Sequence, residues 1–194
     1  MRTIADHILD IASNSIAAGA SDVWLDIASD PEAHMFTFMV RDNGRGMDDD
    51  LQKQVFDPFI TTRPHTIRRF GLGLPLLRQN AELTGGTVGL QSHPGVGTTV
   101  STVFHTDHID CIPTGDIAGA LFALLTCGSP VRWHISRGEG RKRYTLTTED
   151  LEGVFPSGEL SDPRAQQLLL RFLQEREADL VADASRRDDG SSTT

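Results

Sequence analysis

Hydrophobic and polar positions change their period several times along the chain, and each change marks a predicted element. Residues 3–18 repeat at about 100° per residue, with isoleucines on one arc and acids on another, which predicts an amphipathic helix. Gly19 follows at once, as expected at a helix C-terminus. Alternation then predicts strands over residues 23–27 and 35–41. The chain is therefore expected to open with one helix and two strands.

A second set of elements repeats this order. Residues 48–56 are expected to form a short helix, because acids occupy its first turn, where the helix dipole favours them. A longer helix is predicted over residues 74–83, followed by strands over residues 87–91 and 98–104. Residues 60–70 have little periodicity, which indicates a loop. The order predicts an α+β fold in which helices cover one face of a mixed sheet.

The remaining residues have periodicity but no motif that translates into chemistry. The predicted elements are a helix at 116–127, a hairpin at 131–147 and an amphipathic helix at 161–181. We expect residues 106–182 to form a small α+β extension that packs on the first layer or mediates assembly, with a homodimer among the options. The polar residues 183–194 are expected to be disordered.

Size and composition limit the class of protein. A chain of 194 residues with 38% hydrophobic residues suits one domain, or one domain with an appendage. Neither a membrane-spanning apolar run nor a signal-peptide pattern is present, so we expect no membrane partner. Cys111 and Cys127 fit neither a disulfide framework nor a metal pair, which favours the reducing cytoplasm.

The net charge argues against one class of partner. The chain carries a formal charge of −9, spread over both halves. Nucleic-acid binding depends largely on neutralising phosphates with lysine and arginine. Because the chain offers no basic excess, we expect no nucleic-acid partner.

Two polar positions have the chemistry of a ligand site. Asp42 ends a predicted strand, and Gly44 and Gly46 would let a ligand approach the backbone there. Asn14 follows Asp10 by four residues, so both side chains lie on one face of the first helix. A carboxamide oxygen suits Mg²⁺, and an acid could serve as a base. An Asx turn at Asp42 and a solvated helix face around Asp10 are the alternatives.

Four short segments, taken in order, resemble a known family. They are Asn14 on its helix, DNGRG at 42–46, FGLGL at 70–74 and GVGTT at 95–99. Their order resembles the Bergerat-type ATP-binding fold, a two-layer α/β sandwich, of the GHKL proteins: gyrase, heat-shock chaperone ATPases, histidine kinases and MutL. The segment VFDPFITTR at 55–63 resembles the phenylalanine box of sensor histidine kinases. The resemblance covers residues 1–105.

The resemblance also implies roles for particular residues. Asp42 would read the adenine amino group, Asn14 would hold Mg²⁺, and Asp10 would be the general base. The Thr98 hydroxyl would bridge to adenine through a water molecule. Arg63, Arg68 and Arg69 would neutralise the triphosphate. The implied ATP site comprises Asn14, Asp42, Gly44, Gly46, Met47, Arg63, Arg69, Gly71, Leu72, Gly73, Leu74 and Thr98.

The implied function is phosphate transfer in signal transduction. Asn14 follows only 13 residues, so we expect a histidine-kinase-like catalytic module without its own phosphoacceptor arm. Such a module would transfer the γ-phosphate of ATP to a His, Ser or Thr of a separate protein. The alternative is a nucleotide-gated regulatory binding module, or a slow ATPase without kinase activity. In the gated case, ATP would order residues 60–70 and change what the second half binds.

Overall fold

The computed structural model describes residues 2–57, 73–155 and 162–182. Its centre is a mixed sheet of six strands, counted over these residues, in the order β3-β4-β2-β1-β5-β6. The strands are β1 (Asp22–Asp30), β2 (Met35–Asp42), β3 (Thr87–His93), β4 (Gly97–His105), β5 (Arg132–Glu139) and β6 (Lys142–Thr147). Neighbouring strands are antiparallel except β1 and β5, which are parallel.

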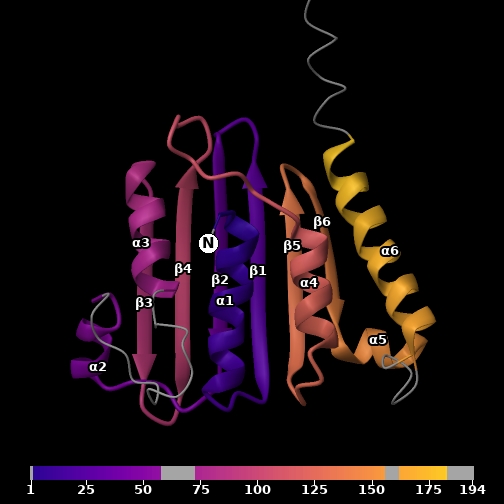
Figure 1. Ribbon diagram of the computed structural model, residues 1–194, viewed down its shortest axis with the longest axis horizontal. Coiled ribbons are helices and arrows are strands. Elements are labelled where there is room, and N and C mark those ends of the chain that lie inside the picture. The colour runs from indigo at the N-terminus through magenta and orange to yellow at the C-terminus, as the bar shows by residue number, and fades with distance from the viewer. Residues whose placement is uncertain (1, 58–72, 156–161, 183–194) are drawn as a thin grey trace, which may run out of the picture.

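The longer helices lie together on one side of this sheet (Figure 1). The helices are α1 (Ile4–Ala17), α2 (Asp49–Gln54), α3 (Gly73–Leu83), α4 (Ile117–Thr126), α5 (Thr148–Val154) and α6 (Pro163–Val181). In Figure 1, α3, α1 and α4 stand in front of the strands and α6 lies beside β6. The predicted α+β sandwich, with helices on one face of a mixed sheet, is confirmed.

Most element positions follow the sequence patterns. Thr3 caps α1 in a reciprocal capping box with Asp6, which explains why the helix begins at Ile4. Asp48 caps α2 and Asp162 caps α6, and a proline at the start of α6 suits the first helical turn. The short helix α5 was not predicted, although Thr147 and Asp150 form a capping box at its start.

The core lies between the sheet and the helices. The largest fully buried side chains come from both layers: Phe36, Phe38, Phe104, Ile4, Ile8, Leu25, Ile27, Leu77, Leu121, Leu124, Ile135 and Leu169. Residues of α1, of the central strands and of α4 and α6 belong to one continuous cluster. The C-terminal elements therefore share a core with the N-terminal ones, and burial of this apolar surface stabilises both.

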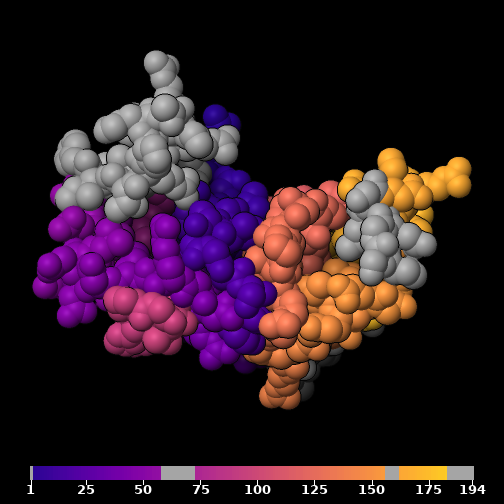
Figure 2. Space-filling view, turned by 90° about the horizontal axis from the view of Figure 1, so that it is seen from below, coloured from indigo at the N-terminus to yellow at the C-terminus, as the bar shows by residue number. Residues whose placement is uncertain are grey.

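The C-terminal region is joined to the sheet through β5. This strand lies parallel to β1 along its length, from the pair Asp22–Arg132 to the pair Ser29–Glu139. Seen from below, a furrow on the side of the helices separates the indigo and purple N-terminal part from the orange C-terminal part (Figure 2). The two regions are thus continuous in the sheet, and beneath this furrow α1 and α4 still pack against each other. In the part of the chain that the structure describes, we find no helix long and apolar enough to span a membrane.

Candidate functional site

A buried carboxylate forms the centre of the site. Asp42, the last residue of β2, is 8% exposed. Its Oδ2 accepts a hydrogen bond from the hydroxyl of Ser15 on α1, at 2.8 Å. Its Oδ1 accepts from the backbone N–H groups of Gly44, at 2.9 Å, and Thr98, at 3.2 Å. A buried carboxylate needs such donors, and these three fix its orientation.

A second polar cluster supports the neighbouring turn. The hydroxyl of Ser92 on β3 accepts from the backbone N–H of Met47 at 2.8 Å and donates to the carbonyl of Gly97 at 3.0 Å. It also lies 2.9 Å from the hydroxyl of Thr98. The carboxamide of Gln52 on α2 donates to the carbonyl of Ser92 at 2.8 Å. These bonds join the segment after β2 to the β3–β4 hairpin.

Two glycines of the motifs stand where a side chain would not fit. A Cβ at Gly46 would lie 1.9 Å from the carbonyl oxygen of His93, and its φ of 64° is in the left-handed region. A Cβ at Gly97 would lie 1.9 Å from the carbonyl oxygen of Asp42, with a φ of 133°. The close approach of backbones at these positions requires glycine. The glycines of the DNGRG and GVGTT motifs therefore shape the site even without a ligand.

Helix α1 brings its polar face to the start of α3. Asp10 and Asn14 are both half-buried and lie one turn apart. A Cβ placed on Gly73 would lie 1.8 Å from Oδ2 of Asp10, so this carboxylate lies against the first residue of α3. The structure thus brings together the proposed base and the glycine segment that precedes a helix. Anions are favoured at such helix N-termini.

The buried histidine of α1 lies one turn before Asp10. His7 is fully buried, and its Nε2 lies 2.9 Å from the carboxamide nitrogen of Asn80 on α3. Its Nδ1 has no hydrogen-bond partner among the described residues. Burial lowers the pKa of His7 to about 4, from an ordinary value of 6.5, so the ring is neutral near pH 7. His7 joins α1 to α3 as a neutral group.

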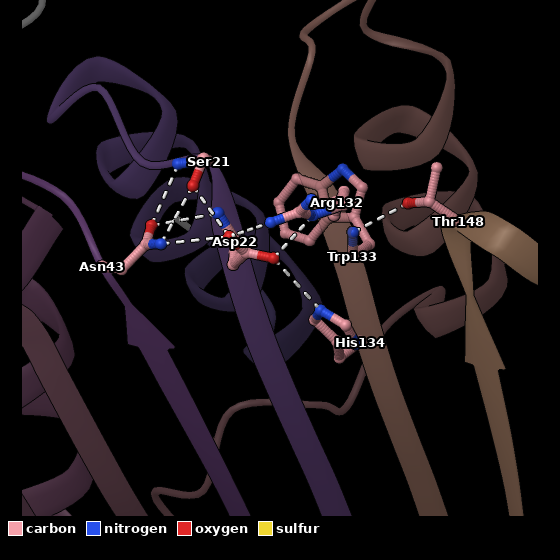
Figure 3. Close-up of polar contacts among 7 residues, drawn as sticks. All are labelled: Ser21, Asp22, Asn43, Arg132, Trp133, His134 and Thr148. Carbon is pink, nitrogen blue, oxygen red and sulfur yellow. Dashed lines mark hydrogen bonds and ion pairs between the residues drawn. The ribbon is translucent and has the colours of Figure 1, made fainter.

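The residue after Asp42 connects the site to the C-terminal region (Figure 3). The Asn43 carboxamide accepts from the backbone N–H groups of Ser21 and Asp22, both at 3.0 Å, and donates to Oδ2 of Asp22 at 3.0 Å. The Arg132 guanidinium on β5 donates to both oxygens of Asp22, at 2.8 and 2.7 Å, and His134 lies 3.5 Å from Oδ1. Hydrogen bonds from Arg132 hold the pKa of the Asp22 carboxyl well below its usual range.

The predicted site residues divide into two groups. Those within the described ranges lie along α1, the ends of β2 and β4, and the start of α3: Asp10, Asn14, Asp42, Gly44, Gly46, Met47, Gly73, Leu74 and Thr98. Hydrogen bonds join Asp42 to Gly44 and Thr98, and the Asp10 carboxylate lies against Gly73. The predicted phosphate contacts Arg63, Arg68 and Arg69, and the residues Gly71 and Leu72, lie outside the described residues.

Sequence reasoning missed the groups that hold these residues in place. Ser15 is buried beside Asp42, and Ser92 and Gln52 support Met47. Asn43 was read only as part of its motif. The sequence signal for Ser15 was its hydroxyl beside Asn14, because its hydrogen-bond partner Asp42 lies 27 residues further along the chain. Contacts between distant segments carry no local pattern.

Two other features bear on what the site can hold. Among the described residues, no group of three or more His, Cys, Asp or Glu side chains is placed to hold a metal ion. A cavity of about 600 Å³ lies at the opposite end of the sheet, lined in part by Ser29, Arg137 and Glu177, and is remote from Asp42. The chemistry of the site therefore rests on Asp42 and the polar face of α1.

Comparisons with known proteins agree with this geometry. A family model described as histidine kinase-, DNA gyrase B- and HSP90-like ATPase matches residues 2–108. The virulence sensor protein BvgS of Bordetella bronchiseptica is 33% identical over 105 residues, which cover 52% of this chain and 8% of that protein. The methanogenesis regulatory histidine kinase FilI of Methanothrix harundinacea is 40% identical over 70 residues, covering 36% and 8%.

The osmosensing histidine protein kinase SLN1 of Saccharomyces cerevisiae is 39% identical over 70 residues, covering 34% of this chain and 6% of that protein. The matched segments thus span less than a tenth of the length of each of these three relatives. Among solved structures, the N-terminal domain of a DNA repair protein superposes with a TM-score of 0.56 at 15% identity. It covers 82% of this chain and 59% of that one, and this likeness is one of fold.

Proposed function

Because the chain belongs to the histidine kinase-, DNA gyrase B- and HSP90-like ATPase family, we propose that it binds ATP with Mg²⁺ and transfers the γ-phosphate to a separate protein. The relatives named as sensor proteins and histidine kinases support a role in signal transduction. The cysteines Cys111 and Cys127 are free thiols, which supports action in the cytoplasm.

The observation that carries this proposal is the state of Asp42. A carboxylate has about four lone-pair positions, and three donors occupy three of them in the described structure. The remaining position is on Oδ2 and suits the 6-amino donor of adenine. Because Asp42 is buried, it cannot move to follow a ligand, so it selects one with a donor at that point.

The polar face of α1 supplies the remaining chemistry. The carboxamide of Asn14 is an oxygen donor of the kind Mg²⁺ prefers, and this ion keeps several waters and binds phosphates. The metal would neutralise charge on the transferring phosphate. Asp10 would take the proton from the attacking nucleophile, while ADP leaves. Its position against Gly73 places it beside the helix start that would face the phosphates.

Calorimetry on the pure protein tests nucleotide binding. Mg-ATP should bind, and GTP, whose ring has a carbonyl in place of the 6-amino donor, should bind far more weakly. Asp42→Asn is the matched variant. The Ser15 hydroxyl can rotate to accept a hydrogen bond from the new amide, so the fold should persist. The same amide N–H₂ would face the 6-amino group of adenine, and two donors cannot form a hydrogen bond. Absence of heat with millimolar Mg-ATP would exclude the proposal.

Phosphate transfer is tested by incubating the protein with γ-labelled ATP and a lysate of its host. A labelled acceptor that disappears with the Asp10→Asn variant would support a kinase, and acid lability of the label would distinguish phosphohistidine from phosphoserine. The gated binding module remains the second candidate, because β5 and the turn after β2 are linked through Asp22 of β1. In that case partner binding would follow ATP occupancy and survive Asp10→Asn.

A further inference from the structure

The side chains of Arg41 and Asn43, the neighbours of Asp42, are each connected to β5 through a residue of β1. Strand alternation points Asp42 toward the helices, where Ser15 meets it, and directs Arg41 and Asn43 to the other face of the sheet. On that face, the Arg41 guanidinium lies 4.1 Å from the ring centre of Trp24. Both neighbours of the adenine-reading carboxylate are therefore held from the face opposite the nucleotide.

The first route runs through rings. Trp24 on β1 stacks on His134 of β5, with ring centres 5.2 Å apart and planes 12° apart. The strand register explains this arrangement, because Arg41, Trp24 and His134 occupy one row across the sheet. Stacking and cation–π contacts of this kind contribute modestly and fix side-chain orientation. Arg41 is thus tied to the C-terminal region through a single aromatic ring.

The second route runs through an ion pair and hydrogen bonds. Arg132 donates two hydrogen bonds to the Asp22 carboxylate, which in turn accepts from the Asn43 carboxamide (Figure 3). A parallel backbone route exists, because the Arg132 N–H donates to the Ser21 carbonyl at 2.8 Å and the Ser21 N–H donates to Asn43 at 3.0 Å. A two-pronged guanidinium–carboxylate pair fixes geometry as well as charge.

We propose that Arg132, from the C-terminal region, is a positioning residue for the nucleotide site, acting through Asp22 and Asn43 on the turn that carries Asp42. This inference rests on the proposed ATP binding. The turn comprises residues 42–46. Its backbone is held by the Arg45 N–H, which donates to the Ala18 carbonyl at 3.0 Å, and by the Gly95 N–H, which donates to the Arg45 carbonyl at 2.8 Å. The Asn43 carboxamide is its side-chain anchor to β1. Loss of the pair at Arg132 would leave Asp22 and the Asn43 carboxamide less firmly held, which weakens the support of the turn behind the adenine position.

The consequence is coupling between two regions. A partner that engages Arg132 on the open face of the sheet would change nucleotide affinity, and bound nucleotide would change that partner's affinity by the same factor. Arg132 has a side chain that is 58% exposed, so it is accessible to such a partner while Asp22 is nearly covered. The pair is also screened by solvent, which limits the size of the effect.

The test compares Mg-ATP binding by the full-length wild-type protein and by Arg132→Gln, using calorimetry well below the thermal midpoint of each. We expect the dissociation constant to rise about fivefold, a size set by a partly exposed charge pair. ADP should lose the same factor, because the turn reads adenine rather than the γ-phosphate. Arg132→Lys should recover only part of the loss, since an ammonium cannot form the two-pronged pair.

Arg143→Gln is the matched control. Arg143 on β6 lies 3.3 Å from Asp26 on β1, and it too links the C-terminal region to the sheet by a partly exposed ion pair. Asp22, the partner of Arg132, is hydrogen-bonded to Asn43, whereas Asp26, the partner of Arg143, pairs with Met39 in the middle of β2. Arg143→Gln should therefore leave the dissociation constant unchanged even if both variants lower the thermal midpoint alike. An equal weakening of ATP binding in both variants would overturn the inference, because it would indicate a general loss of stability.

A double variant separates a positioning role from a direct one. If Arg132 acts through Asp22, then Asp22→Asn should weaken ATP binding as Arg132→Gln does, and combining both changes should add little. Additive losses would overturn the proposed route. Failure of the wild type to bind Mg-ATP would refute the proposed function itself, whereas binding that Arg132→Gln leaves unchanged would refute only this inference.

Discussion

The two regions of this molecule share one sheet but use buried polar groups differently. In the N-terminal region, Asp42 is buried with a lone-pair position remaining, beside Asn14 and Asp10 on α1. In the C-terminal region, the buried Arg137 forms ion pairs with Glu139 at 2.9 Å and with Glu177 at 3.1 Å. The carboxylate of Asp42 can therefore accept a further hydrogen bond from a ligand. The charge of Arg137 is already paired within the protein, and this pairing joins α6 to the sheet.

The difference teaches that burial of a charge does not by itself mark a site. Glu177 also accepts a hydrogen bond from the Tyr144 hydroxyl at 2.8 Å, so the partners of Arg137 are themselves satisfied. Burial and the Glu177 charge raise the pKa of Tyr144, which keeps this hydroxyl a donor. Such networks lock the position of an element. The Arg137 cluster therefore serves packing, and the chemistry that we propose lies in the N-terminal region.

The largest expected effect concerns turnover in the N-terminal region. Asp10→Asn should slow phosphate transfer or hydrolysis by roughly 10²–10⁴-fold, the usual contribution of a general base. Nucleotide affinity should stay nearly constant, because the proposed role of Asp10 is in the reaction and not in adenine recognition. Single-turnover rates together with calorimetry would separate the two quantities.

Glu82→Gln is the control for charge removal, because Glu82 lies at the opposite end of α3 from Gly73. Glu82 is exposed on α3 and pairs with Arg78 at 2.9 Å on the surface. Its substitution should leave turnover unchanged. Equal turnover by Asp10→Asn and the wild type would exclude Asp10 as the base.

The next effect concerns stability in the C-terminal region. Leu173 on α6 is fully buried and belongs to the core shared by both regions. Leu173→Ala should lower the free energy of unfolding by about 2–5 kcal/mol. The dissociation constant of ATP should not change at a temperature where the variant is folded, because Leu173 lies on α6, which packs on α4, β5 and β6. Chemical denaturation and calorimetry give the two values.

Leu168→Ala on the same helix is the matched control. The Leu168 side chain is 57% exposed, so its truncation should cost less than about 0.5 kcal/mol. Equal losses at the two positions would contradict the packing of α6 described above.

Much of this contrast was predictable from sequence, and the part that was not has a physical reason. Local periodicity and caps predicted α1, β1 and β2 to within a few residues. The motifs also singled out Gly46 and Gly97, positions at which the structure leaves no space for a Cβ. By contrast, the parallel pairing of β5 with β1 joins residues 110 positions apart, and no local pattern encodes it. The link from Asn43 to Arg132 was invisible for the same reason.

Recognition of adenine should respond to a single atom change. Asp42→Asn should weaken Mg-ATP binding by roughly 1.5–3 kcal/mol, the typical value for a hydrogen bond to a charged group. The three donors that hold Asp42 restrict its carboxylate to one orientation, so the loss should not be recovered by rotation. Ser101→Ala on the open side of β4 is exposed and should not change affinity. Weakening of equal size in both variants would contradict the assignment of Asp42.

The smallest expected effect is the loss of stability in acid, which we expect to begin with His7 of the N-terminal region. The pKa of His7 is about 4 in the folded protein and about 6.5 when the chain is unfolded. As the pH falls from 6.5 to 4, the unfolded chain takes up a proton that the folded one excludes, so the free energy of unfolding should fall by roughly 2 kcal/mol. The carboxyl groups of Asp22 and Asp150, whose pKa values are lowered, lose their contribution only at lower pH. His7→Gln should flatten this interval in denaturation curves, whereas His93→Gln, at an exposed position, should not. An unchanged slope in His7→Gln would show that the acid response originates elsewhere.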